Sequence, residues 1–259
     1  EERSDPLYFE INQVLTACHD KLLESVRFYL QRIQNNGADC KEVDLKTFKN
    51  LLKVFRHLIS QDLPAAVEDN LGHWTEILMA TIKIKPAFSD VQLNDLWFKC
   101  KGEAISSVLM FGTRYRDDWN EAIEPFAAEI WKTISEGPAV NDDRHEKIIV
   151  NAMKYFKSFS ETEKFHGFFS QNITTMFTKV LIPNLSPDPS TQDTFNEEPD
   201  SFVECLISNK ELGDRAETSI NFIRSLSKFH NTRVEETIKI VIGEYIQTFN
   251  NNQPNSINE

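Results

Sequence analysis

Apolar residues recur at intervals of three and four positions along nearly the whole chain, and this spacing constrains the fold more than any other feature. Such spacing places them on one side of an α-helix, whereas a half-buried strand needs alternation every two positions. One such stripe runs through Phe48, Leu51, Leu52, Phe55 and Leu58. The sequence therefore predicts an all-α protein.

The predicted helices form antiparallel pairs. The pairs are 7–34 with 42–60, 65–85 with 90–114, 118–136 with 142–159 and 163–183 with 212–230, and a last helix covers 232–250. The first helices start 45 to 69 residues apart, at or above the period of HEAT-type repeats. Each pair is too small to bury its own stripe, so neighbours must stack into a solenoid. One globular helical bundle is the alternative interpretation.

We expect residues 1–259 to form a single array of four to five helix pairs that is truncated at both ends. The chain begins without Met, and the helix at 232–250 has no following partner. Both features indicate a piece of a longer protein.

Charge and cysteine content exclude several classes of function. The net charge of −12 argues against a general nucleic-acid binder and against an anionic membrane surface. No apolar run approaches the roughly 20 residues of a membrane span, so we expect no membrane insertion. No two of the four Cys lie within twenty residues of each other, which excludes zinc-finger spacing and favours a reducing compartment.

The sequence carries none of the common catalytic or cofactor-binding patterns. The six His occur singly, no Gly-x-Ser-x-Gly elbow or phosphate-loop spacing occurs, and His145-Glu146 lacks the second His of a zinc motif. We therefore expect no enzyme, no catalytic residue, no cofactor and no metal.

An acidic, Pro-containing segment interrupts the helical pattern. The stretch Pro183–Asp200 carries four Pro and cannot form one regular helix. Between Asn184 and Asp214 eight acidic residues stand against one Lys, a net charge of −7. We interpret 184–211 as an acidic insertion within one repeat.

Six short stretches, in one order from about residue 60 to 230, carry a resemblance to a known family. They are Gln61–Pro64 with Glu68–Asn70 and Trp74; Tyr115 with Asp117–Asp118, Pro125–Phe126 and Ile130–Trp131; Val150–Ala152 with Phe156; Val180–Asn184; Phe195–Pro199; and Leu226–Phe229. Together they resemble the importin-α export receptors of the karyopherin-β family.

The resemblance implies a right-handed α-solenoid of HEAT repeats that is the middle part of a receptor several times longer. Such receptors bind the GTP form of the small GTPase Ran together with importin-α, contact nucleoporins and shuttle between nucleus and cytoplasm. It also implies that the acidic insertion lies near the Ran-binding concavity. The candidate Ran-facing residues are Asp188, Asp193, Glu197, Glu198 and Asp200.

Two other functions stay open at this point. Trp97–Lys101 is similar to an element of importin-7 type import receptors, and periodicity alone equally suits a HEAT scaffold unrelated to transport. The chain also departs from the export-receptor pattern, because the Arg-rich stretch expected after the insertion is reduced to Arg215. Ion pairs made by those Arg residues therefore do not carry over.

Overall fold

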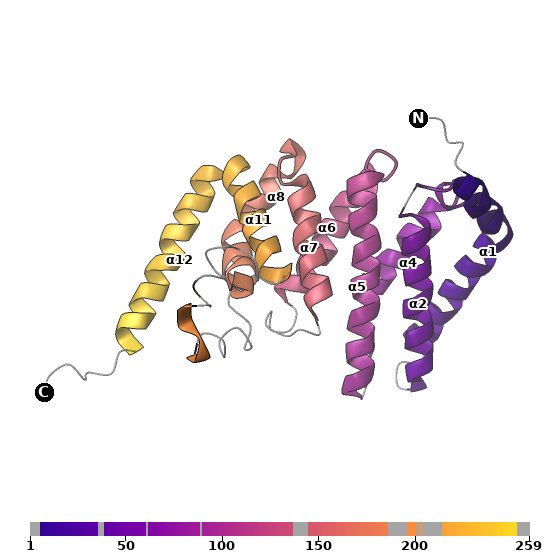
Figure 1. Cartoon of the computed structure of the whole chain (residues 1–259), viewed down its shortest axis with the longest axis horizontal. Coiled ribbons are helices and arrows are strands. Elements are labelled where there is room, and N and C mark those ends of the chain that lie inside the picture. The colour runs from indigo at the N-terminus through magenta and orange to yellow at the C-terminus, as the bar shows by residue number, and fades with distance from the viewer. Residues whose placement is uncertain are drawn as a thin grey trace, which may run out of the picture. The chain divides into compact units, whose positions relative to one another are not determined.

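The computed structural model describes residues 6–35, 39–60, 62–88, 90–136, 145–185, 196–200, 203 and 214–252. This part of the chain is built from helices and the turns that join them, and no strand occurs in it (Figure 1). The predicted all-α class is confirmed.

The chain divides into two compact units, and the boundary falls inside one helix. Unit 1 holds residues 1–138 and 142–155, and unit 2 holds 139–141 and 156–259. Unit 1 contains α1 (Pro6–Asn35), α2 (Glu42–Leu58), α3 (Ala65–Glu68), α4 (Leu71–Lys83), α5 (Val91–Arg114), α6 (Asn120–Ser135) and most of α7 (Glu146–Phe159). Unit 2 contains the end of α7, η3 (Glu163–Phe165), α8 (His166–Met176), η4 (Phe177–Leu181), η5 (Pro183–Leu185), α11 (Asp214–Phe229) and α12 (Asn231–Asn252). That the two units belong to one array stays a prediction.

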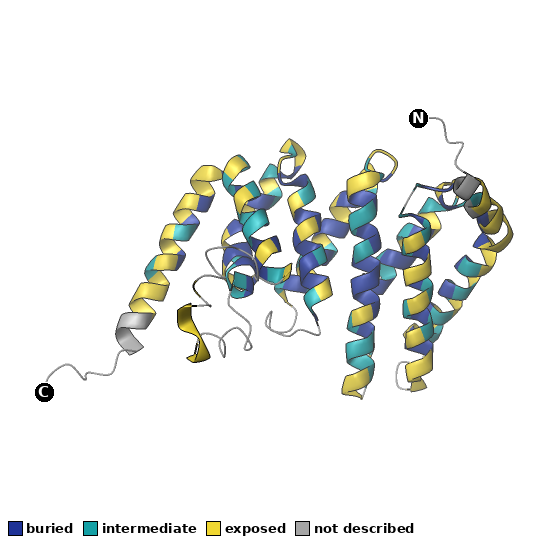
Figure 2. Cartoon of the chain, viewed as in Figure 1, coloured by how far each residue is buried: buried dark blue, intermediate teal, exposed yellow. Residues whose placement is uncertain are grey.

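The core of unit 1 lies where the predicted stripes meet. The α2 helix packs along α1 on one side and along α5 on the other, and α4 packs on α5 (Figure 2). Phe48, Leu52 and Phe55 of α2 have no exposed surface, and Phe55 stacks on Trp74 of α4 with ring centroids 3.8 Å apart. Each such buried side chain contributes about 1.5–3 kcal/mol.

The core of unit 2 is dominated by phenylalanine. Phe159 lies 5.6 Å from Phe156, 4.5 Å from Phe165 and 5.8 Å from Phe169, measured between ring centroids. Phe222 of α11 meets Phe169 edge-on at 6.3 Å. These tilted and edge-to-face arrangements are the ones that aromatic quadrupoles favour.

The predicted helix 65–85 is broken into two. The α3 helix ends at Glu68, and α4 begins at Leu71 after Asn70, whose φ of −111° and ψ of 17° are not helical. The Asn70 side chain donates from Nδ2 to the Ala66 carbonyl at 3.0 Å. A short amide side chain that bonds its own backbone competes with the helix, which explains the break.

The predicted helix 163–183 is also irregular, because its last turn is π-helical. The Ile182 amide donates to the Phe177 carbonyl, five residues back, at 3.0 Å. Two side chains then donate hydrogen bonds to the last carbonyls of this turn. Asn184 Nδ2 donates to the Val180 carbonyl at 2.6 Å, and Ser219 Oγ donates to the Leu181 carbonyl at 2.8 Å. Pro183 has no amide proton and cannot continue the ladder.

Candidate functional site

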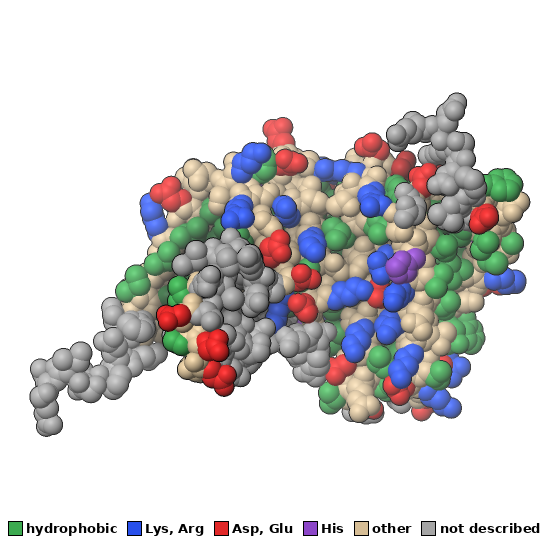
Figure 3. Space-filling model, in the orientation of Figure 1, with side chains coloured by type: hydrophobic (Ala, Val, Ile, Leu, Met, Phe, Trp, Pro, Cys, Tyr) green, Lys and Arg blue, Asp and Glu red, His purple; other side chains and the backbone are tan. Residues whose placement is uncertain are grey.

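The described part of the acidic insertion is exposed. Glu197, Glu198 and Asp200 lie in the short segment 196–200, and Figure 3 shows acidic side chains gathered there. Asp188 and Asp193 lie outside the described residues. Exposed carboxylates of this kind influence the encounter rate with a basic partner more than the final affinity. Their role towards Ran therefore stays a prediction.

A basic surface on unit 1 was not predicted from the sequence. It is called the basic face here and consists of Lys46, Lys49, Lys53 and Arg56 on α2, Lys99 on α5, and Lys147 and Lys154 on α7. The spacing of three and four residues along α2 aligns its four bases on one side of that helix. Figure 3 shows Lys and Arg side chains gathered over α2 and α5. The whole-chain charge of −12 conceals this surface, although α2 has four bases and no acid after Asp44.

One carboxylate, Glu103 of α5, joins three helices within the basic face. Its Oε2 accepts from Arg56 Nε of α2 at 3.1 Å, and its Oε1 accepts from Lys147 Nζ of α7 at 2.6 Å. Only 9% of the Glu103 side chain is exposed. Burial by itself raises the pKa of this carboxyl, but Lys147 and Arg56 outweigh burial and hold the pKa below its usual range. Glu103 is therefore ionised at neutral pH and fixes the spacing of the three helices.

Further contacts hold α7 against its neighbours in unit 1. Asn151 Nδ2 donates to Ser106 Oγ of α5 at 2.7 Å, and the Tyr155 hydroxyl donates to the Ile123 carbonyl of α6 at 2.8 Å. Burial raises the pKa of the Tyr155 phenol far above its usual value. The basic face thus stands on a rigid frame rather than on loops.

Two His residues that the sequence shows as isolated lie together in unit 2. The rings of His166 and His230 have centroids 4.9 Å apart, and His230 Nε2 lies 3.1 Å from the Ser160 carbonyl. Burial lowers the pKa of His230, with a smaller lowering effect from His166, while the Ser160 carbonyl opposes both. Because the two residues are 64 positions apart in the sequence, a search for residues at local spacing does not pair them.

Within the described ranges no three His, Cys, Asp or Glu side chains are placed to hold a metal ion. None of the described helices is long and apolar enough to cross a membrane.

Comparisons with known proteins agree on one family. A sequence model described as Cse1 matches residues 1–258. Exportin-2 of Drosophila melanogaster is 20% identical over 254 residues, covering 95% of this chain and 25% of that protein. Exportin-2 of Oreochromis niloticus is 22% identical over 237 residues, covering 88% and 24%. Exportin-2 of Homo sapiens is 20% identical over 261 residues, covering 97% and 26%.

A solved structure shares the fold. It is "The exportin Cse1 in its cargo-free, cytoplasmic state", with a TM-score of 0.79 at 16% identity, covering 97% of this chain and 28% of that one. The likeness confirms the predicted α-solenoid of HEAT repeats. The chain spans about a quarter of the length of the relatives it matches.

Proposed function

This chain belongs to the Cse1 family, and we propose that it is part of a nuclear export receptor that binds Ran-GTP and carries importin-α from nucleus to cytoplasm. One observation carries the proposal: a single family model matches residues 1–258, and so both units. The relatives matched here are named exportins, and the six collinear stretches resemble the same receptors. A receptor of this kind contacts nucleoporins as it shuttles, and it acts by reversible binding rather than by catalysis.

The exposed charges suit such a role. Ran has basic patches on its surface, and the carboxylates of Glu197, Glu198 and Asp200 are exposed on unit 2. We assign these three, with Asp188 and Asp193, to the encounter with Ran. The basic face of unit 1 suits the opposite kind of partner, a surface rich in Asp and Glu.

The proposed mechanism of binding follows from the repeat architecture. Each repeat contacts only its neighbours, so a partner that binds one pitch of the array better than another shifts the array towards that pitch. In the proposed cycle Ran-GTP and importin-α favour the same pitch, and each strengthens the binding of the other.

The first experiment uses the full-length parent protein as bait in nuclear extract, with and without Ran loaded with a GTP analogue. We expect Ran-GTP to be required for the recovery of importin-α. Recovery of a different set of proteins with Ran-GTP indicates an import receptor, and recovery that ignores the nucleotide indicates a scaffold. Either of those two results contradicts the proposal.

A second experiment tests the five acidic residues in the same parent protein. All five are changed to Asn or Gln, and the association rate with Ran-GTP is measured at low and at high salt. We expect slower association at low salt and little difference at high salt, because exposed charges are screened beyond about 10 Å at 0.1 M salt. A matched control neutralises five other exposed acids, Glu68, Asp117, Asp118, Glu121 and Glu161. Equal association rates in the two variants would contradict the assignment of the five acidic residues to the encounter with Ran.

A further inference from the structure

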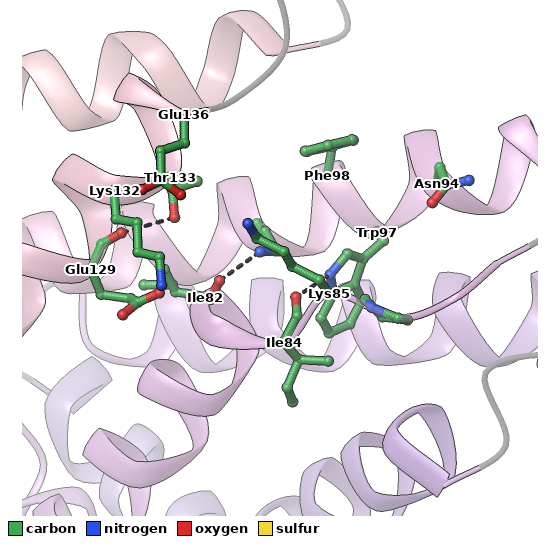
Figure 4. A pocket seen from close by; sticks show the side chains of 12 residues that line it. Ile82, Ile84, Lys85, Asn94, Trp97, Phe98, Glu129, Lys132, Thr133 and Glu136 are labelled. Atoms are coloured by element: carbon green, nitrogen blue, oxygen red, sulfur yellow. Dashed lines mark hydrogen bonds between the residues drawn. The ribbon is translucent and has the colours of Figure 1, made fainter.

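A pocket of unit 1 is lined by a buried lysine that the proposed export function does not explain. The cavity has a volume of about 260 Å³ and lies between the end of α4, the first half of α5 and the end of α6 (Figure 4). It is lined by Ile82, Ile84, Lys85, Pro86, Asn94, Trp97, Phe98, Lys101, Glu129, Lys132, Thr133 and Glu136. All of these residues belong to unit 1.

Lys101 is the unusual member of this lining. It is only 4% exposed, and its Nζ donates to the Ile82 carbonyl at 2.5 Å. An ammonium group has three N–H donors, and a buried charge is normally paired with an opposite charge. Among the residues that the structure describes, Lys101 forms no ion pair with a carboxylate. The site thus keeps a buried positive charge whose partner is a neutral carbonyl.

A second lysine adds to this charge. The Lys85 side chain extends towards the centre of the pocket in Figure 4. The pKa of Lys101 is lowered to about 8, chiefly by burial and also by the positive charge of Lys85, against the weaker effect of the Glu129 carboxylate. Two neighbouring ammonium groups disfavour each other's charge, and an anion between them relieves both.

The other lining residues and the volume of the pocket restrict which anions fit. Ile84, Pro86, Trp97 and Phe98 give an apolar side, and the Trp97 indole is fixed because its Nε1 donates to the Ile84 carbonyl at 3.2 Å. The volume is below the roughly 300–1,000 Å³ of sites for drug-sized molecules, so a side chain fits better than a nucleotide. The lining has two acids: Glu129 lies in α6, and Glu136 directly follows the last residue of that helix.

We propose that this pocket binds a partner polypeptide through one acidic side chain, whose carboxylate meets Lys101 and Lys85 while an adjacent apolar residue packs on the aromatic wall. The recognition is the charge-assisted hydrogen bonding that lysine gives to carboxylates, inside a concave and partly apolar site. The pocket belongs to unit 1 alone, and its test uses neither Ran nor importin-α. Failure of this inference and failure of the export function are therefore distinguishable.

The test is a chemical-shift titration of the 259-residue chain, following the indole N–H of Trp97. The probes are the blocked tripeptide acetyl-Leu-Glu-Leu-amide and its neutral analogue acetyl-Leu-Gln-Leu-amide. We expect the Glu peptide to shift the Trp97 signal and to leave the buried Trp119, which donates to Thr75 Oγ1 at 2.9 Å, unchanged. The Gln peptide should bind about tenfold more weakly or worse, the usual effect of losing a charge-assisted hydrogen bond.

Two variants assign the effect to the lysines. Lys85→Gln alters an exposed residue and leaves the fold intact, so it tests the site even if Lys101→Met, which removes the bond to Ile82, fails to fold. Each variant that folds should bind the Glu peptide about tenfold more weakly and the Gln peptide as before. Lys179→Gln, the same charge change at an exposed position of unit 2, serves as the control.

Three outcomes overturn the inference. Equal binding of the two peptides would show that the carboxylate is not recognised. Unchanged binding of the Glu peptide by Lys85→Gln would show that the charge of Lys85 does not contribute. A thymidine hexanucleotide that shifts the Trp97 signal at lower concentration than the Glu peptide shows that the site prefers phosphate, and so a nucleic acid.

Discussion

Gly112 of α5 lies directly against the ring of Tyr155 on α7: a Cβ placed on Gly112 would stand 2.9 Å from Cε2 of that ring. Tyr155 has no exposed surface, and its hydroxyl is bound to the Ile123 carbonyl, so the ring has nowhere to move. The absence of one methyl group therefore sets how closely α5 and α7 approach.

Gly112→Ala should accordingly destabilise the chain, although alanine is the better helix former. Overpacking of a tight core typically costs about 1–3 kcal/mol, which exceeds the gain of about 1 kcal/mol from helix propensity. Urea unfolding at neutral pH measures the difference. Gly243→Ala in α12 is the matched control, because nothing lies within 4 Å of the added methyl, and it should stabilise slightly. Stabilisation by both substitutions would show that the Tyr155 contact is not tight.

Glu103→Gln should weaken the connection between α2, α5 and α7. The change leaves Arg56 and Lys147 without their shared carboxylate, at a cost of about 1–3 kcal/mol, since Lys147 is half exposed and solvent compensates it in part.

The cost of this substitution should depend on pH in a defined direction. The pKa of Glu103 is lowered on folding, so its contribution is complete above the ordinary pKa of 4.5 and is lost as the pH falls through the lower folded value. The difference in unfolding free energy between wild type and Glu103→Gln should shrink between pH 5 and pH 3. A constant difference over that range contradicts the ion-pair explanation.

His230 should make the stability of unit 2 sensitive to mild acid. Folding lowers the pKa of His230, so its contribution is complete above the ordinary value of 6.5 and declines as the pH falls below it, since the unfolded chain takes up the proton first. His230→Gln keeps a donor for the Ser160 carbonyl and should lose less stability than wild type between pH 7.5 and 5.5. The His230 ring-proton shifts give the pKa directly, and a titration midpoint at or above 6.5 refutes the prediction.

Lys101 should release its proton near pH 8, well below the ordinary lysine value of 10.5. Protonation of the buried amine therefore costs stability: what its neutral form contributes is present above pH 10.5 and is lost as the pH falls towards 8. Carbon-13 labelling of the lysine Cε atoms reports the pKa of Lys101. Lys85→Gln removes the neighbouring positive charge and should raise that pKa, whereas Lys179→Gln should leave it unchanged.

Sequence periodicity located the helices well because burial and spacing coincide. The stripe that predicted 42–60 became α2, with Phe48, Leu52 and Phe55 fully buried. Periodicity did not detect the break at Asn70 or the π turn at 177–181, because both depend on single hydrogen bonds that leave the apolar spacing unchanged. Apolar patterns report which side of a helix is buried, and not whether its ladder is continuous.

The candidate sites show a second limit of prediction from sequence. Acidic residues clustered within thirty-one positions of the sequence are visible without a structure. The basic face draws residues from α2, α5 and α7, and the pocket places Lys85 and Lys101 together across sixteen positions. Such sites arise only when helices pack, so a search by local spacing does not find them.

The hydrogen bonds at the end of the η4 helix have a consequence for how this chain can evolve. Asn184 donates to the Val180 carbonyl from the same segment, whereas Ser219 donates to the Leu181 carbonyl from α11, whose Phe222 and Leu226 are buried. A change at position 219 therefore affects both the end of η4 and the attachment of α11. Because two elements depend on this one hydroxyl, we expect position 219 to accept fewer substitutions than the exposed positions of α11.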